Sequence, residues 1–111
     1  MTLSQKLKLV RDALLNLGAP VFHYEKDGTA GERYIVWSET YEDGDYFADN
    51  HKFEQVIRGT IDMFTHTEFD ELADLIQQAL NDCSRISWRL NSASYEDETG
   101  FIHYEWEFWV Y

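Results

Sequence analysis

The chain has 111 residues and a mass of 13.2 kDa, and its 21 acidic and 9 basic residues give a formal net charge of −12. This charge repels phosphate groups, so it argues against direct nucleic-acid binding and against docking on anionic membranes. Hydrophobic residues make up 44% of the chain, which is typical of a folded protein. A single cysteine excludes an internal disulfide. The chain has no apolar run of about 18 residues and no signal-peptide pattern, so we expect a soluble protein in a reducing compartment.

The first predicted element is an amphipathic helix. Its apolar residues recur at spacings of four and three and predict one buried stripe, made of Leu3, Leu7, Val10, Leu14 and Leu17. Thr2 and Gln5 have the spacing of a capping box at its beginning, and Gly18 and Pro20 end it. The basic residues of this segment are expected on its other faces: Lys6, Lys8 and Arg11.

Two short strands are predicted next, Val21–Tyr24 and Tyr34–Ser38, joined by a polar connector that contains Gly28. The segment Glu39–Lys52 that follows is acidic and has no apolar period, so we predict a long loop there.

The segment Phe53–His66 alternates in the manner of a long strand. We expect its more apolar set to face the helices: Gln55, Ile57, Gly59, Ile61, Met63 and Thr65. Gly59 is the expected place for a bend or bulge.

A second helix is predicted after this strand, with Thr67 as its cap. Acidic residues follow in the first turn, where the helix dipole favours them. The predicted buried stripe consists of Phe69, Leu72, Ile76 and Leu80, widened by Leu75 and Ala79.

The chain is predicted to close with a hairpin whose turn is Asp97–Gly100. One face of the last strand is apolar and belongs in the core: Ile102, Tyr104, Trp106, Phe108 and Val110. The opposite face mixes aromatic and acidic residues: Phe101, His103, Glu105, Glu107, Trp109 and Tyr111. These elements together predict a single α+β domain over residues 1–111, with an antiparallel or mixed β-sheet, two helices packed on one face and a C-terminal β-hairpin.

No pattern in the chain points to catalysis. The acidic segment approaches the spacing of a calcium loop but has Phe47 and Ala48 where a ligand and a glycine are required. Cys83 has no positioned histidine near it in the sequence, and a zinc site across the strands at His66 and His103 is disfavoured. There is no nucleophile elbow, phosphate-binding loop or dinucleotide fingerprint. We therefore expect no enzymatic activity, no cofactor and no metal.

Two segments are candidates for protein–protein contact because large aromatic residues favour interfaces. The acidic segment contributes Tyr41, Asp43, Asp45, Tyr46, Phe47, Asp49 and His51. The outer face of the last strand contributes His103, Glu105, Glu107, Trp109 and Tyr111.

Over nearly its whole length the chain resembles the small tail-completion and tail-terminator proteins of long-tailed bacteriophages and prophages. The residues that carry this resemblance are the opening helix followed by Val21–Tyr24, then Arg33–Trp37, Ala48–Lys52, Gln55–Asp62, the helix Phe69–Leu80 and the ending Gly100–Trp106. These are likenesses to virion structural proteins, with no catalytic residues to transfer.

The resemblance implies a minor virion protein that assembles on the end of the tail tube, as a hexameric ring in contact with the tail tube protein and the head-connector protein. It implies a location in the virion tail, and in the host bacterial cytoplasm during assembly, with no direct nucleic-acid binding and no membrane. Two alternatives stay open. An acidic DNA mimic would inhibit a host nucleic-acid-binding protein, in keeping with the charge of −12. A small α+β enzyme would need a deep apolar pocket with converging polar groups, of which the sequence gives no sign.

Overall fold

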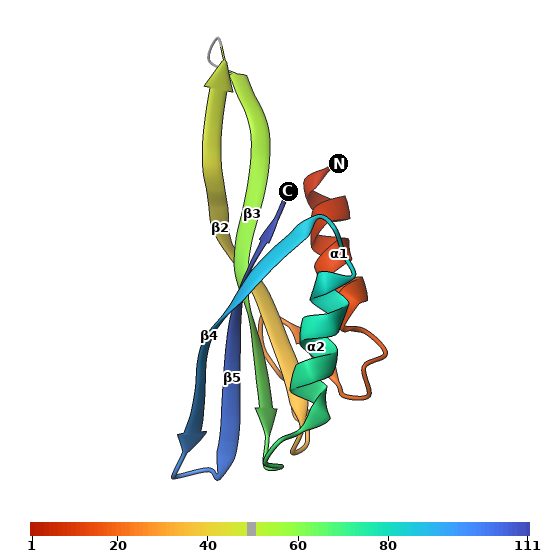
Figure 1. The fold of residues 1–111 in the computed structure, drawn as a ribbon, viewed down its shortest axis with the longest axis vertical. Helices are drawn as coiled ribbons and strands as arrows, with labels where there is room; N and C mark the ends of the chain where they lie inside the picture. Colours follow the sequence, from red (N-terminus) through yellow and green to blue (C-terminus); the bar gives the residue numbers. More distant parts are fainter. Residues whose placement is uncertain (49–50) are drawn as a thin grey trace.

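The computed structural model describes residues 1–48 and 51–111, and for residues 41–48 and 51–54 it describes the backbone alone. The chain forms a five-stranded mixed sheet with strand order β1-β2-β3-β5-β4, and two helices lie along one side of it (Figure 1). In chain order the elements are α1 (Leu3–Leu14), β1 (Val21–His23), β2 (Tyr34–Ala48), β3 (His51–Thr65), α2 (Glu71–Asn81), β4 (Ile86–Glu96) and β5 (Phe101–Val110). β1 pairs with β2 in parallel, and every other pairing is antiparallel. The predicted α+β class, with its C-terminal hairpin, is confirmed.

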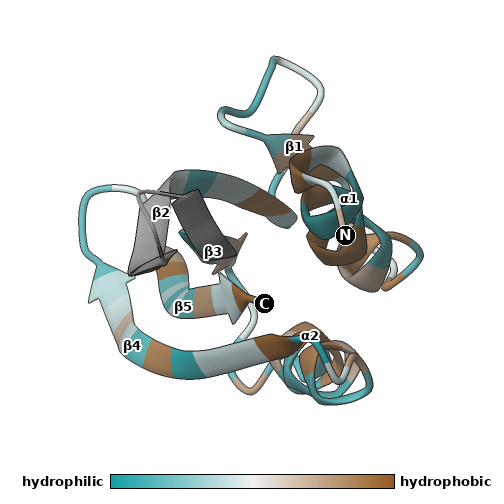
Figure 2. Ribbon diagram, turned by 90° about the horizontal axis from the view of Figure 1, so that it is seen from above, coloured by the Kyte–Doolittle hydropathy of each residue, from teal (hydrophilic) through white to brown (hydrophobic). Residues whose placement is uncertain are grey.

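The core lies between the two helices and the sheet face that they cover (Figure 2). Its fully buried side chains come from α1 and α2 (Val10, Leu14, Leu72, Ile76 and Leu80) and from the strands (Ile35, Ile61, Met63, Trp106, Phe108 and Val110). The alternation predicted for Phe53–His66 therefore has the correct phase, because Ile61 and Met63 face the helices.

α1 begins as predicted, but it ends at Leu14, before the stop predicted at Gly18 and Pro20, and two of its residues differ in burial. Thr2 and Gln5 form the capping box, each side chain bonding the other's backbone N–H. Leu3 is exposed, contrary to the prediction, and Lys6 is buried although it was expected on another face. The aliphatic stem of a lysine can cover apolar surface, and the Lys6 ammonium donates a hydrogen bond to the Gln55 carbonyl on β3.

α2 begins three residues later than predicted. Its N-cap is Asp70 and not Thr67, because the Asp70 carboxylate accepts the Leu72 N–H at 2.9 Å. Phe69, which was placed in the buried stripe, precedes the helix with a φ of 57° and is 88% exposed. Leu72, Ile76 and Leu80 form the stripe as predicted.

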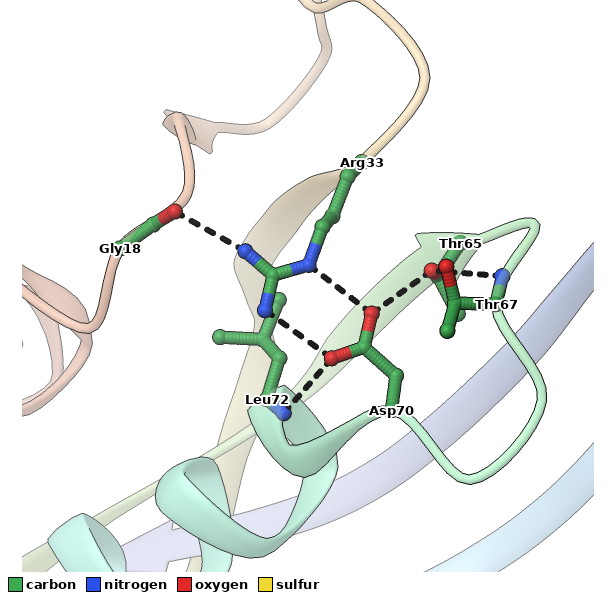
Figure 3. A network of polar contacts seen from close by, with 6 residues as sticks. All are labelled: Gly18, Arg33, Thr65, Thr67, Asp70 and Leu72. Atoms are coloured by element: carbon green, nitrogen blue, oxygen red, sulfur yellow. Dashed lines mark hydrogen bonds and ion pairs between the residues drawn. The ribbon is translucent and has the colours of Figure 1, made fainter.

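Asp70 also holds three segments together (Figure 3). The Arg33 guanidinium donates to both of its oxygens, at 2.8 and 2.9 Å, and to the Gly18 carbonyl at 3.0 Å. The Thr65 hydroxyl donates to the Asp70 carboxylate at 2.7 Å and accepts the Thr67 N–H at 3.2 Å. The cap of α2 is therefore bonded to the end of β3 and to the segment that leads into β2.

The loop predicted over Glu39–Lys52 is wrong. β2 continues to Ala48, β3 begins at His51, and the two strands form one long antiparallel hairpin. The pairing of the two backbones needs no apolar period in the sequence, so the alternation on which strand prediction depends did not reveal it.

Gly59 lies beside the first irregularity of this hairpin. The pairing passes from Glu39 opposite Gly59 to Tyr41 opposite Arg58, so the extra residue is Thr40 on β2. A Cβ on Gly59 would lie 2.2 Å from the Ser38 carbonyl oxygen and 2.5 Å from Cζ of Phe108. The predicted irregularity occurs at this level, but the glycine serves the close approach of two neighbours.

Candidate interaction surfaces

The β2–β3 hairpin extends beyond the rest of the sheet as a two-stranded ribbon (Figure 1). We define the ribbon as Ser38–Ala48 of β2 with His51–Val56 of β3. Pairing with β1 stops at Trp37, and pairing with β5 stops at Ile57. Among the described strands, none pairs with the outer edges of the ribbon. Unpaired strand edges expose backbone donors and acceptors that can bind another chain.

The first group of predicted interface residues lies on this ribbon. Tyr41, Asp43, Asp45, Tyr46 and Phe47 belong to β2, and His51 is the first residue of β3. Asp49 lies outside the described residues. By sequence, residues 39–54 contain six acidic residues and one lysine. The ribbon is therefore an acidic projection and not an acidic loop.

The second predicted group lies on the sheet face that carries no helix, called the open face below. β5 is an inner strand, between β3 and β4, so only its side chains and not its backbone edge face a partner. Tyr111, just after β5, is exposed. The outer side chains of β5 contact those of β3 and β4 on the same face.

Glu107 does not present its charge to a partner. Its carboxylate is 10% exposed and forms ion pairs with Arg58, at 2.9 Å from Nε, and with Arg89, at 3.0 Å. The same two guanidinium groups lie over the Trp109 ring, 5.4 and 5.9 Å from its centroid. This part of the predicted interface is an internal network of paired charges.

His103 is also engaged within the chain. Its Nε2 lies 2.7 Å from the Asp62 carboxylate, and its Nδ1 lies 3.6 Å from Glu96. Its ring stacks on Phe64 with centroids 4.2 Å apart, and Phe64 stacks on Tyr34 at 4.9 Å. Aromatic and acidic side chains therefore alternate across the open face of β2, β3 and β5.

A cleft opens on this face, with a volume of about 270 Å³. We call it the acidic cleft; its lining residues are Glu25, Lys26, Tyr34, Val36, Asp62 and Phe64. The Lys26 ammonium lies 5.6 Å from the centroid of the Tyr34 ring. Burial raises the pKa of Tyr34, and the negative charge of Glu96 adds to this effect. The cleft thus offers the carboxylates of Glu25 and Asp62 beside an aromatic wall, a setting that favours cationic side chains.

A second cleft, of about 220 Å³, lies between α1 and the first strands. We call it the basic cleft; its lining residues are Ser4, Leu7, Lys8, Arg11, His23 and Trp37. The His23 ring stacks on Trp37 at 3.9 Å and on Tyr24 at 3.7 Å, and its Nε2 lies 2.9 Å from Glu39. This cleft contains two of the nine basic residues of the chain.

The sequence patterns did not identify either cleft. The period of two does place Asp62 and Phe64 on the face opposite the core. The pairing of β2 with β3 and the course of the β1–β2 connection bring Asp62 and Phe64 next to Glu25 and Tyr34. Neither feature is visible in the local sequence.

The described residues show no arrangement typical of metal binding. Within that part of the chain, no group of three or more His, Cys, Asp or Glu side chains is placed to hold a metal ion. His66 stacks on Phe101, whereas His103 contacts Asp62 and Glu96, so the two histidines have different partners. Cys83 is half-buried and packs against the core. Neither described helix has the length and apolar character that a membrane crossing requires.

The chain matches no protein-family model, and no curated protein is similar enough to it to count as a match.

Proposed function

We propose that the protein is a structural component of a bacteriophage or prophage virion, a tail terminator or head–tail joining protein that caps the tail tube as a ring. The resemblance in the sequence motivates the proposal, and the observation that carries it is the β2–β3 ribbon. A ring needs a surface that reaches from each subunit to a different surface of the next. A ribbon with two unpaired backbone edges, projecting from a body about 25 Å thick, suits that role.

Charge also supports this function. At a net charge of −12, a ring of such subunits would present carboxylates to DNA passing through it, so the phosphates would find few cations to bind. The proposal places the protein in the virion tail, and in the bacterial cytoplasm during assembly, and assigns it no catalytic role.

The test is assembly with the full ribbon and with a shortened one. A shortened variant would replace residues 47–53 with Asn-Gly, a two-residue turn that joins the paired residues Tyr46 and Glu54; it keeps the Gln55 carbonyl that the buried Lys6 bonds and the buried Val56. We expect the full chain to form rings by light scattering and electron microscopy and to bind purified tail tubes of its phage. The shortened variant, with its fold checked by circular dichroism, should do neither.

The DNA-mimic alternative predicts a different outcome. A mimic would stay monomeric or dimeric and would bind a basic host protein with a strong dependence on salt. Finding that behaviour, with no binding to tail tubes, would overturn the proposed function.

A further inference from the structure

The basic and acidic clefts lie on opposite faces of one strand. Trp37 of β2 points to the helix-covered face and lines the basic cleft, whereas Tyr34 and Val36 point to the open face and line the acidic cleft. This follows from the alternation of side chains along a strand. The molecule therefore carries complementary charges on two different faces, a few residues apart in β2.

We infer that Lys8 and Arg11 of one copy bind in the acidic cleft of a second copy of this chain, so that subunits associate head to tail. The inference deepens the proposed function, on which it rests for the expectation that the assembly closes into a ring. Because the two surfaces are different, such a contact is heterologous, and a heterologous contact can generate a ring.

Lys8 and Arg11 are the available cations. They lie three residues apart on α1 and so share a side of the helix. The Arg11 side chain is 48% exposed and pairs with its sequence neighbour Asp12 at 2.9 Å, a weak surface contact. Lys8 is exposed, and the described residues give its ammonium no ion pair.

Most of the other basic residues are already engaged within the chain. Lys6 bonds the Gln55 carbonyl, Arg33 bonds Asp70, and both Arg58 and Arg89 pair with Glu107. Among the described side chains, Lys8 and Arg11 on α1 are two exposed basic residues that lie on one side of the same helix.

The acidic cleft has the chemistry to accept a guanidinium group. The Asp62 side chain is 24% exposed, and its bond to His103 uses Oδ1. Tyr34 and Phe64 stack on each other beside it and form an aromatic wall of the cleft, with Tyr34 itself buried. The Lys26 ammonium lies 5.6 Å from the centroid of the Tyr34 ring, so this wall of the cleft already accommodates a cationic group.

The experiment uses two charge reversals, Arg11→Glu and Asp62→Lys, in the full chain. Each variant keeps one of the two surfaces and loses the other. Alone, each should self-associate about tenfold more weakly than the wild type, as loss of a close charge pair predicts. Mixed in equal amounts, they should regain the larger assemblies of the wild type, because every junction between unlike variants joins opposite charges: intact Arg11 meets intact Asp62, and the two reversed positions meet each other. Analytical ultracentrifugation distinguishes these species.

Matched controls reverse charges elsewhere on the surface. Arg85→Glu and Asp74→Lys alter exposed residues outside both clefts, and both should assemble as the wild type does.

Glu25→Lys provides a second reversal in the acidic cleft, at an exposed residue, should Asp62→Lys fail to fold. Lys26→Ala removes the internal cation and should tighten association about twofold to fivefold.

The inference is overturned if the wild type stays monomeric up to about 1 mM, or if the cleft variants assemble as well as the controls. It is also overturned if the equimolar mixture assembles no better than either variant alone. The proposed function fails separately, if assembly follows the expected pattern but the assemblies do not bind tail tubes.

Discussion

The two faces of the sheet are stabilised by different forces. The helix-covered face buries large apolar side chains completely, among them Trp106 and Phe108. The open face carries half-buried aromatic rings interleaved with ion pairs, such as that of Arg58 with Glu107. Because side chains alternate along β5, both environments occur within a single strand.

The comparison shows where function can reside in this fold. Burial of apolar area on the covered face is insensitive to salt and leaves nothing for a partner to contact. Charges and ring faces on the open face respond to salt and can exchange an internal partner for an external one. The acidic cleft, with Lys26 over Tyr34, is such a place.

Two tryptophans on β5, one on the helix-covered face and one on the open face, allow a direct comparison of the two faces. Trp106 is fully buried, with its Nε1 donating to Gln77 at 3.0 Å, and Trp106→Ala should lower the free energy of unfolding by about 4 kcal/mol. Trp109 is half-buried beneath two guanidinium groups, and Trp109→Ala should cost about 1–2 kcal/mol. Urea unfolding measures both losses. Equal losses would contradict the distinction between the faces.

Asp70 is a buried charged residue at the edge of the helix-covered face, where most buried side chains are apolar. Hydrogen bonds from Arg33, aided by the Leu72 N–H and the Thr65 hydroxyl, hold the pKa of the Asp70 carboxyl well below its usual range, although burial acts in the opposite direction. Asp70→Ala removes both the charge and the cap and should cost about 3 kcal/mol. Asp70→Asn retains a capping oxygen and should cost about 2 kcal/mol, the contribution of a charged hydrogen bond.

The dependence of this effect on pH has a definite sign. A carboxyl with a lowered pKa stabilises the fold above its unfolded pKa of about 3.9, and the contribution is lost as the pH falls below that value. The difference between wild type and Asp70→Asn should therefore be full at pH 7 and should shrink steadily below about pH 4. Asp74→Asn, on the exposed side of α2, is the control, and a difference that persists at low pH would contradict the assignment.

Local sequence patterns predicted the parts of the fold that face the core. The stripe Leu72, Ile76 and Leu80 and the alternation through Ile61 and Met63 are set by burial, which repeats with the period of the element. The turn at Gly100, with a φ of 75°, follows from the conformational freedom of glycine.

The wrong predictions have a common cause, which is competition from partners distant in sequence. Thr67 has the chemistry of a cap, but Asp70 also gains bonds from Arg33, 37 residues away, and from Thr65. Lys6 is buried with its ammonium donating a hydrogen bond to a carbonyl 49 residues away. The acidic segment after Glu39 forms a strand because β3 supplies a backbone partner. None of these partners is visible in a local window, and the same holds for both clefts.

Substitution of Glu107 is expected to lower the free energy of unfolding least among these variants. It tests whether ion pairs stabilise the open face. Glu107→Gln keeps the shape of the side chain and one acceptor oxygen but removes the charge shared by Arg58 and Arg89. We expect a loss of about 1–2 kcal/mol at low salt, below that of a fully buried pair because the Arg89 side chain is well exposed. In about 1 M NaCl, where the screening length falls to about 3 Å, the loss should decrease. Glu98→Gln in the β4–β5 turn is the matched control, and an equal loss there would mean that aromatic packing alone stabilises the open face.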